Sequence, residues 1–311
     1  MHSLKTSNKH VIVWVNNAKI FAIFAVVILH VSADVVSSAD TINNRQWWIG
    51  NIYDSVVRWC VPVFVMLSGV LLLKNEKTES VYLFYKKRAG RILLPTLFWS
   101  LFFLVWTYMK GVGNESVKSI MSLGKSLFLG SPYYHMWYLY MLIGLYIATP
   151  FVRIFVKNAS IHELTFLIVI LFSITAANSL YGSLYDVKKG LFIIWFLNYL
   201  PYFICGYLIG FFDARLTKSF LVLLFILSVL ATATGCHFVS QYHGLKRGLY
   251  FYNYLSITVI PMSIAIILLF KRTTNPIINA RITNRLAGFV LGIYVIHYNT
   301  PQKLDRAIRC M

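Results

Sequence analysis

Long apolar segments recur along the whole chain and are separated by short polar stretches. Each segment approaches or exceeds about 18 residues, the length at which an apolar helix can cross a bilayer. The pattern therefore predicts an all-α fold, a polytopic membrane bundle of about nine to ten transmembrane helices. We expect spans at residues 11–36, 52–73, 92–110, 134–156, 163–181, 191–212, 219–240, 249–270 and 285–301.

Composition supports a membrane protein. Hydrophobic residues make up 58% of the 311 residues and charged residues only 13%, about half of what a soluble domain carries. No polar stretch is long enough to fold alone, so we expect a single integral-membrane domain over residues 1–311. We expect the first span to be retained, because it is too long for a signal-peptide core and no cleavage site follows it.

The net charge of +19 resembles that of a nucleic-acid-binding protein, but basic residues in membrane proteins mark cytoplasmic loops. With a cytoplasmic N-terminus, the inner segments hold 16 Lys and Arg and the outer loops hold eight. We therefore expect the N-terminus inside, the lipid bilayer as a partner, and no nucleic acid. Nine spans would leave a basic C-terminal tail outside, so either the last span does not cross or a further helix is missing.

Signature motifs of common enzyme classes do not occur in the sequence. There is no GxSxG elbow, Walker loop or HExxH motif, which removes support for hydrolase, ATPase and zincin assignments. The spacing of the four cysteines suggests neither a disulfide nor a zinc site. We expect no metal and no permanently bound cofactor, and small packing roles for Cys60, Cys205, Cys236 and Cys310.

The first span carries ionisable side chains in its interior. Lys19 and His30 are eleven residues apart, so they share a helix face and lie about 16 Å apart along the axis. Asp34 follows one turn later. Ionisable groups inside a span indicate a site, and an imidazole can take a proton from a hydroxyl and return it. Asp34 would orient the ring or lie in the headgroup layer. The structural alternative is that Lys19 reaches the interface and His30 bonds a neighbouring helix.

A basic cluster, Lys86-Lys87-Arg88-Ala-Gly-Arg91, precedes the third span. Two arginines three residues apart project to one side of a helix, and guanidinium groups match phosphate oxygens in bidentate geometry. The cluster would suit a phosphorylated donor such as a coenzyme A thioester. The alternatives are ordinary cytoplasmic charge and binding of anionic lipid. Residues 81–95 are amphipathic, and we expect an interfacial helix there, with Pro95 kinking or restarting the chain.

The second span contains Arg58, which needs a partner inside the membrane. Asp34 and Asp54 are the candidates. Pro62 frees backbone groups one turn away, and Ser68-Gly69 offers a small surface for close helix packing. Arg58 is thus a candidate site residue, whereas helix packing is the expected role of Ser68-Gly69.

Two further histidines lie at span positions. His135 belongs to Tyr133-Tyr134-His135-Met136-Trp137-Tyr138, which is either an interfacial aromatic belt or a sugar-stacking platform with a histidine donor. His297 lies in the last apolar run, where a packing role is the alternative to a site. With the N-terminus inside, His30, His135 and His297 fall in the outer half of the membrane. The arginine pair falls at the inner face, which would place a charged donor below and a polar acceptor above.

These motifs resemble the membrane acyltransferase-3 family, most closely its enterobacterial common antigen O-acetyltransferase branch. Lys19 stands where that branch usually has arginine, and Asn16 where it can have aspartate. The matching stretches are Lys19-x10-His30, Arg58-x3-Pro62 through Phe64-Val-Met-Leu-Ser-Gly69, Arg88-x2-Arg91, His135-Met-Trp137 and Gly292-Ile-Tyr-x-x-His297.

The resemblance implies transfer of an acetyl group from cytoplasmic acetyl-coenzyme A to a hydroxyl of a surface polysaccharide or its lipid-linked precursor, in a bacterial inner membrane. His30 would be the base or the transient acyl carrier, and Arg58 and His135 would polarise the acyl carbonyl or orient the acceptor. Donor binding would fall to Lys19, Lys86, Lys87, Arg88 and Arg91.

Two other functions stay open at this stage. One is a multi-helix transporter of a glycan or solute, with the buried ionisable groups as a proton relay. The other is an inactive, truncated acyltransferase, because the family normally continues through a tenth helix and this chain ends 14 residues after His297.

Overall fold

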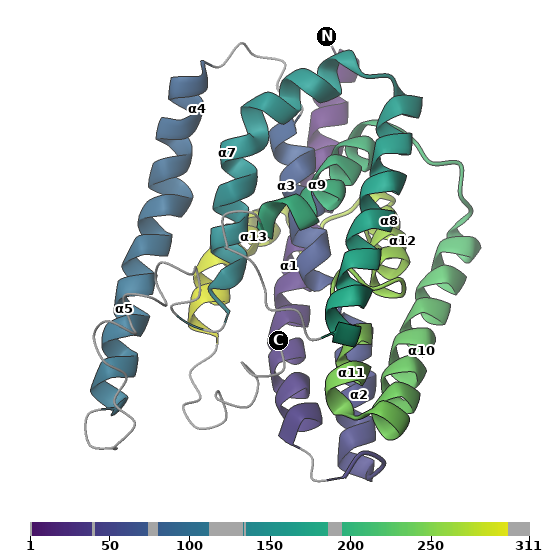
Figure 1. Ribbon diagram of the computed structural model, residues 1–311. Helices are drawn as coiled ribbons and strands as arrows, with labels where there is room; N and C mark the ends of the chain where they lie inside the picture. Colours follow the sequence, from purple (N-terminus) through teal and green to yellow (C-terminus); the bar gives the residue numbers. More distant parts are fainter. Residues whose placement is uncertain are drawn as a thin grey trace. The chain divides into compact units, whose positions relative to one another are not determined.

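The computed structural model describes residues 2–38, 41–73, 80–111, 133, 135–185 and 195–297. Every regular element in these ranges is a helix (Figure 1). Among the described residues, six helices are long and apolar enough to cross a membrane, which confirms the predicted class of all-α polytopic membrane protein. They are Val13–Ser37, Arg45–Leu73, Val81–Trp106, Trp137–Asn158, Ile161–Tyr185 and Lys218–His243.

The chain divides into two compact units. The first unit comprises Met1–Leu71, Ile161–Lys188 and Pro201–Met311, and the second comprises Leu72–Ser160 and Lys189–Leu200. The polar segment 74–79, the Tyr134 ring and Cys310 lie outside the described residues.

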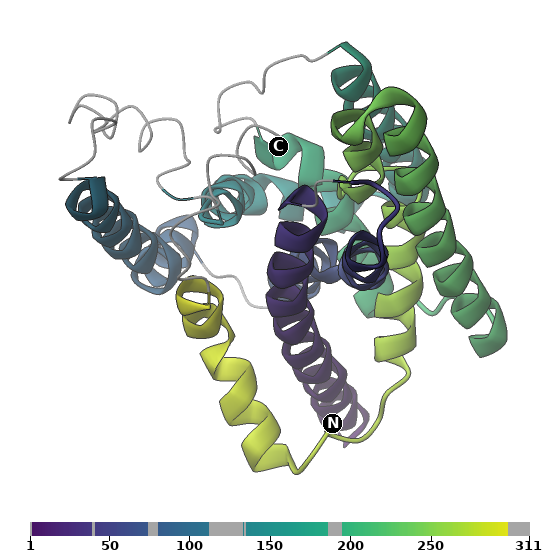
Figure 2. The same ribbon diagram turned by 90° about the horizontal axis from the view of Figure 1, so that it is seen from below.

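The first unit is built around α1. This helix packs against α2, α12 and α13, and α10 packs against α2 and α12. Figure 2 shows α13 lying beside α1. The helices are α1 (His2–Ser38), α2 (Arg45–Val57), α3 (Cys60–Leu73), α8 (Ile161–Tyr185), α9 (Trp195–Phe211), α10 (Lys218–His243), α11 (Leu245–Gly248), the 3-10 helix η3 (Leu249–Tyr252), α12 (Val259–Lys271) and α13 (Ala280–Ile296). Of α9, the part that begins at Pro201 belongs to this unit.

The second unit contains α4 (Val81–Arg88), the π-helical turn η1 (Ala89–Leu93), α5 (Leu94–Gly111) and α7 (Trp137–Asn158). α4, η1 and α5 run on as one helix (Figure 1), so residues 81–95 lead directly into the span, and their interfacial position stays a prediction. Pro95 lacks a backbone N–H and its ring crowds the carbonyl one turn earlier. The helix responds with a wider turn, in which the Leu94 N–H donates to Ala89 O, rather than with a break.

Polar side chains move one predicted boundary. The span expected at 249–270 begins as an α-helix only at Val259. Before it, the side chain of Asn253 accepts a hydrogen bond from Leu255 N at 3.0 Å, and Ser256 Oγ accepts one from Val259 N at 3.3 Å. These bonds satisfy backbone donors outside a helix, so the chain turns although it is apolar. The shorter helices α9 and α12 fall in the expected spans 191–212 and 249–270.

Pro62 interrupts the α-helix within the second span. The α-helix stops at Val57 and resumes at Cys60, so the interruption includes Arg58, four residues before the proline. Proline has no N–H to donate to the carbonyl four residues earlier. The break therefore gives Arg58 a position at a helix end, where its side chain can turn toward neighbouring elements.

Two glycines bring α3 and α9 into backbone contact in the first unit. A Cβ added at Gly69 would lie 1.9 Å from Phe203 O, and one added at Gly206 would lie 2.0 Å from Met66 O. Both distances are far below any allowed contact with a rigid carbonyl. Close approach at small residues is how helices gain dispersion energy in a membrane, and here it holds the Pro62 region against α9.

We predict that Gly69→Ala and Gly206→Ala each lower the apparent melting temperature of the purified protein in detergent. Overpacking costs about 1–3 kcal/mol, which exceeds the gain of about 0.5–1 kcal/mol that alanine brings to a helix interior. Gly288→Ala in α13 is the matched control, since a Cβ there meets no described atom within 4 Å, and it should leave the melting temperature unchanged or higher. Equal melting temperatures for all three variants would contradict the close crossing.

Candidate active site

A single helix carries the first group of candidate residues. α1 is continuous from His2 to Ser38, so Lys19 and His30 lie on one face, about 16 Å apart along the axis. His30 is buried with 8% of its surface exposed, and Lys19 and Asp34 are half-buried.

The ring of His30 stacks on the ring of His297 from the end of α13. Their centroids are 4.8 Å apart and the ring planes differ by 27°. Nδ1 of His297 lies 2.6 Å from Tyr294 O. Because a carbonyl oxygen only accepts hydrogen bonds, this Nδ1 must carry the proton, and Nε2 of the neutral ring is then an acceptor. Sequence analysis treated the two histidines separately, and the structure brings them together.

Near Lys19, side-chain amides tie α1 to the segment that joins α12 and α13. Asn17 donates to Thr273 Oγ1 at 3.2 Å and to Asn275 O at 2.8 Å, and accepts from Ile277 N at 3.2 Å. One residue earlier, Asn16 donates to Asn284 Oδ1 at 2.8 Å. These bonds fix the height of α13 along α1 at one end, while the histidine stack lies at the other.

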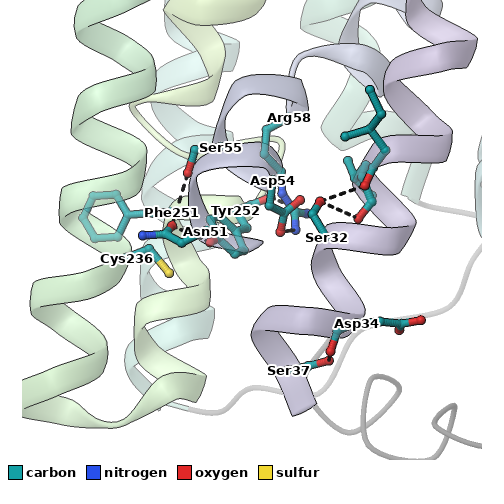
Figure 3. A network of polar contacts seen from close by, with 12 residues as sticks. Ser32, Asp34, Ser37, Asn51, Asp54, Ser55, Arg58, Cys236, Phe251 and Tyr252 are labelled. Carbon is teal, nitrogen blue, oxygen red and sulfur yellow. Dashed lines mark hydrogen bonds and ion pairs between the residues drawn. The ribbon is translucent and has the colours of Figure 1, made fainter. Parts of the chain in front are cut away.

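Arg58 is paired with Asp54, which selects one of the two partners expected from the sequence (Figure 3). Asp54 is fully buried and Arg58 is 7% exposed. Nη2 of Arg58 donates to Asp54 Oδ2 and Nη1 donates to Tyr252 O at 3.2 Å. The guanidinium carbon also lies 4.3 Å from the centroid of the Tyr252 ring, a cation–π contact. The charge is thus held by a carboxylate, a carbonyl and a ring.

The polar network continues from Tyr252 into α2. The Tyr252 hydroxyl donates to Asn51 Oδ1 at 2.5 Å, and Asn51 Nδ2 donates to Ala233 O at 3.0 Å. On the other side, Ser32 of α1 lies beside the Asp54 carboxylate, whereas Asp34 points away from it (Figure 3). The network therefore joins α1, α2, α10 and η3 at the level of Ser32, two residues after His30.

In the second unit, His135 is packed inside an aromatic cluster. It is 1% exposed and meets Phe103 and Tyr133 edge to face at 5.3 and 5.4 Å, while those two rings stack at 4.3 Å. Burial raises the pKa of Tyr133, which keeps its hydroxyl protonated at neutral pH. The rings of Tyr133 and His135 pack against one another and against Phe103, so they do not form an exposed platform.

The basic cluster also lies in the second unit, at the junction of α4 and the π-helical turn. Lys86, Lys87 and Arg91 are exposed and Arg88 is half-buried. Arg91 lies in the π-helical turn, where residues three apart are not related as in an α-helix. The common face expected of Arg88 and Arg91 therefore stays a prediction. Arg88 instead covers the ring of Phe84, with 5.0 Å between the guanidinium carbon and the ring centroid.

The described residues contain neither a disulfide nor a metal-binding cluster that would make a second candidate site. Cys60, Cys205 and Cys236 are free and buried, in agreement with the expected packing roles. No group of three or more His, Cys, Asp or Glu in the described ranges is arranged to hold a metal ion.

The fold and these residues define a class: a multi-span helical membrane protein with a buried histidine and a buried arginine–carboxylate pair in its apolar interior. The chain matches the family model of the acyltransferase domain, acyltransferase 3, over residues 12–300. The match covers most of the chain, so the protein belongs to this family and is a membrane acyltransferase. Comparisons with curated proteins and with solved structures gave no match.

Three features of the site were not predicted from the sequence. Tyr252 supplies both a carbonyl and a ring to Arg58, but no local pattern in the sequence relates the two residues. The pairing of His30 with His297 joins opposite ends of the chain. The choice of Asp54 over Asp34 did have a local signal, because Asp54 and Arg58 are four residues apart, the spacing of neighbours on a helix.

We predict that Asp54→Asn destabilises the protein by about 3–5 kcal/mol, because it leaves the buried guanidinium without its counter-charge. The double variant Asp54→Asn/Arg58→Met should recover much of that loss. Chemical unfolding in mixed micelles measures both.

The control is Asp213→Asn, which removes an ion pair to Lys271 whose aspartate is 96% exposed and should change stability little. If Asp54→Asn were as mild as this control, the buried pair would not carry the stability assigned to it.

Proposed function

We propose that the protein is an O-acetyltransferase of a bacterial inner membrane, with its N-terminus in the cytoplasm. It would take an acetyl group from cytoplasmic acetyl-coenzyme A and pass it to a hydroxyl of a surface polysaccharide or its lipid-linked precursor. Membership of the acyltransferase-3 family supports acyl transfer. The motif resemblance supports the common antigen branch, and the bias of basic residues supports the orientation.

The observation that best supports the proposal is the buried imidazole of His30 in α1, which stacks on the imidazole of His297 at the end of α13. An imidazole in an apolar region can accept a hydroxyl proton without competition from bulk water. The neighbouring ring of His297 disfavours two positive charges at once. The pair would therefore hold at most one extra proton during a cycle.

The proposed reaction uses His30 as the base. Its ring nitrogen takes the proton of the acceptor hydroxyl, and the oxygen attacks the carbonyl carbon of the thioester. The carbon–sulfur bond breaks and the coenzyme A thiolate leaves with the proton returned from the imidazolium. In the alternative course, the imidazole nitrogen attacks the thioester carbonyl carbon, the carbon–sulfur bond breaks and the coenzyme A thiolate leaves. The acceptor hydroxyl then attacks the acetyl-imidazole, the carbon–nitrogen bond breaks, and the hydroxyl proton passes through the regenerated imidazole to the thiolate.

The remaining residues would bind and orient. Arg88 and Arg91 would hold the donor phosphates, with Lys86 and Lys87 adding positive charge. Two further residues of α1 would act on the reacting groups, Lys19 toward the inner end of the helix and Asp34 beyond His30.

For Arg58, the contacts with Asp54 and Tyr252 favour a positioning role. Its guanidinium is already held at three points. It would therefore act by fixing the region that carries His30 rather than by moving toward the donor.

We predict that His30→Gln abolishes transfer of label from acetyl-coenzyme A to glycan in membrane vesicles, with protein levels in the membrane unchanged. Glutamine keeps a polar side chain but cannot cycle a proton near neutral pH. His162→Gln, at an exposed histidine of α8, should retain full transfer.

Label in the glycan of the His30→Gln vesicles at the level of the control would remove His30 from the mechanism. Movement of unmodified glycan across the vesicle membrane, without label transfer by the parent protein, would instead favour the transporter.

A further inference from the structure

The indole ring of Trp48, in the first turn of α2, is fixed by contacts on several sides. Its centroid lies 4.5 Å from that of the His237 ring on α10, with 34° between the two ring planes. Trp47 meets it edge to face at 5.5 Å, and its Nε1 donates to Asn43 Oδ1 at 3.2 Å. Trp48 is nonetheless only half-buried, so part of a rigid aromatic surface is exposed.

The side-chain amide of Asn43 links Trp48 to His237. Oδ1 of Asn43 accepts from the indole and also lies 3.1 Å from Nε2 of His237. Because this oxygen only accepts, Nε2 must donate, and Nδ1 of the neutral imidazole is then an acceptor. Within the described residues, neither this Nδ1 nor Nδ2 of Asn43 forms a hydrogen bond. The indole is thus bordered by one acceptor and by two amide N–H donors.

Asn43 has an unfavourable backbone conformation. Its φ is 128°, and it is the only non-glycine residue with a positive φ in the part of the chain that the structure describes. Residues with a Cβ seldom adopt this region. The two hydrogen bonds to Oδ1 offset the strain and keep the amide between the indole and the imidazole. Strain of this kind is typical of functional sites, which favours a binding role for the cluster.

The cluster lies beyond His30 toward the outer end of α1. The helix α2 runs back along α1 (Figure 1), and a Cβ added at Gly50 would lie 2.9 Å from Val35. Gly50 is therefore level with Val35, which follows His30 by five residues. Trp48 is two residues before Gly50, so it lies about 10 Å beyond His30 along the axis of α1. In the expected orientation this is the side from which a glycan arrives.

We propose that Trp48, Asn43 and His237 form a binding site for a sugar unit of the acceptor glycan. Sugar rings have apolar C–H faces, which pack on an indole, and hydroxyl groups, which need donors and acceptors beside it. The cluster offers both. The choice of a glycan and its approach from outside rest on the proposed function. A sugar unit held here leaves a neighbouring unit of the same chain nearer to His30.

The test measures binding directly, so that it does not depend on catalysis. The probe is the surface polysaccharide of the native host, stripped of O-acetyl groups by mild base, cut to oligosaccharides and labelled with a fluorophore at the reducing end. Fluorescence polarisation follows its binding to the purified protein in phosphatidylcholine nanodiscs. Trp48→Leu should weaken this binding about two- to tenfold, the range that an aromatic contact supplies.

Tyr242→Leu is the matched control for an aromatic side chain at the membrane surface. Tyr242 lies near the end of α10, one to two turns beyond His237, and is 74% exposed. Among the described residues, no ring contact or hydrogen bond holds its side chain. The variant should keep the oligosaccharide affinity within about twofold. A loss equal to that of Trp48→Leu would show a general surface effect and would overturn the site.

A second variant separates binding from folding. Asn43→Gly removes the amide that fixes the indole, but glycine adopts the positive φ without strain. The melting temperature should therefore stay close to that of the parent protein. Oligosaccharide binding should weaken about as much as in Trp48→Leu, because both the orientation of the indole and the amide donors are lost.

The outcomes distinguish this site from the proposed function. If the parent protein binds the oligosaccharides through Trp48 but never labels a glycan from acetyl-coenzyme A, the sugar site stands and the proposed function fails. If the parent labels the glycan while Trp48→Leu and Asn43→Gly bind the oligosaccharides as the parent does, the proposed function stands and the sugar site is overturned. Absence of oligosaccharide binding to the parent protein also overturns the site.

Discussion

A charge among apolar helices has to be neutralised by the protein itself, and the ion pair of Asp54 and Arg58 is where this chain meets that requirement. Tyr252 adds a carbonyl and a ring to the same guanidinium. Because Ser32 lies beside the carboxylate, the pair fixes where α1, α2 and η3 meet. The height of His30, two residues before Ser32, follows from this junction.

The fold was predictable wherever its cause lies within a few residues. Long apolar runs set the class, and Pro62 marks the break between α2 and α3 because a proline acts on the turn before it. The start of α12 was not predictable in this way, because the apolar run continues through 249–258 while the side chains of Asn253 and Ser256 satisfy the backbone. Hydropathy likewise does not distinguish a widened turn from a break, which is why both a kink and a restart at Pro95 were left open.

In the candidate site, too, local relations between residues were predictable and relations that depend on helix packing were not. The common face of Lys19 and His30 results from one continuous helix and could be predicted from spacing alone. The stack of His30 on His297 depends on the packing of α13 against α1, and no local pattern contains it. The contact of Trp48 with His237 similarly depends on how α10 meets α2. Sequence therefore locates the candidate side chains, and tertiary packing decides which of them lie together.

The contact between α3 and α9 has a mechanical consequence. At Gly69 and Gly206 the backbones of α3 and α9 are in contact with no side chain between them. Sliding of one helix along the other would therefore bring backbone atoms into overlap, so we expect the two helices to move together.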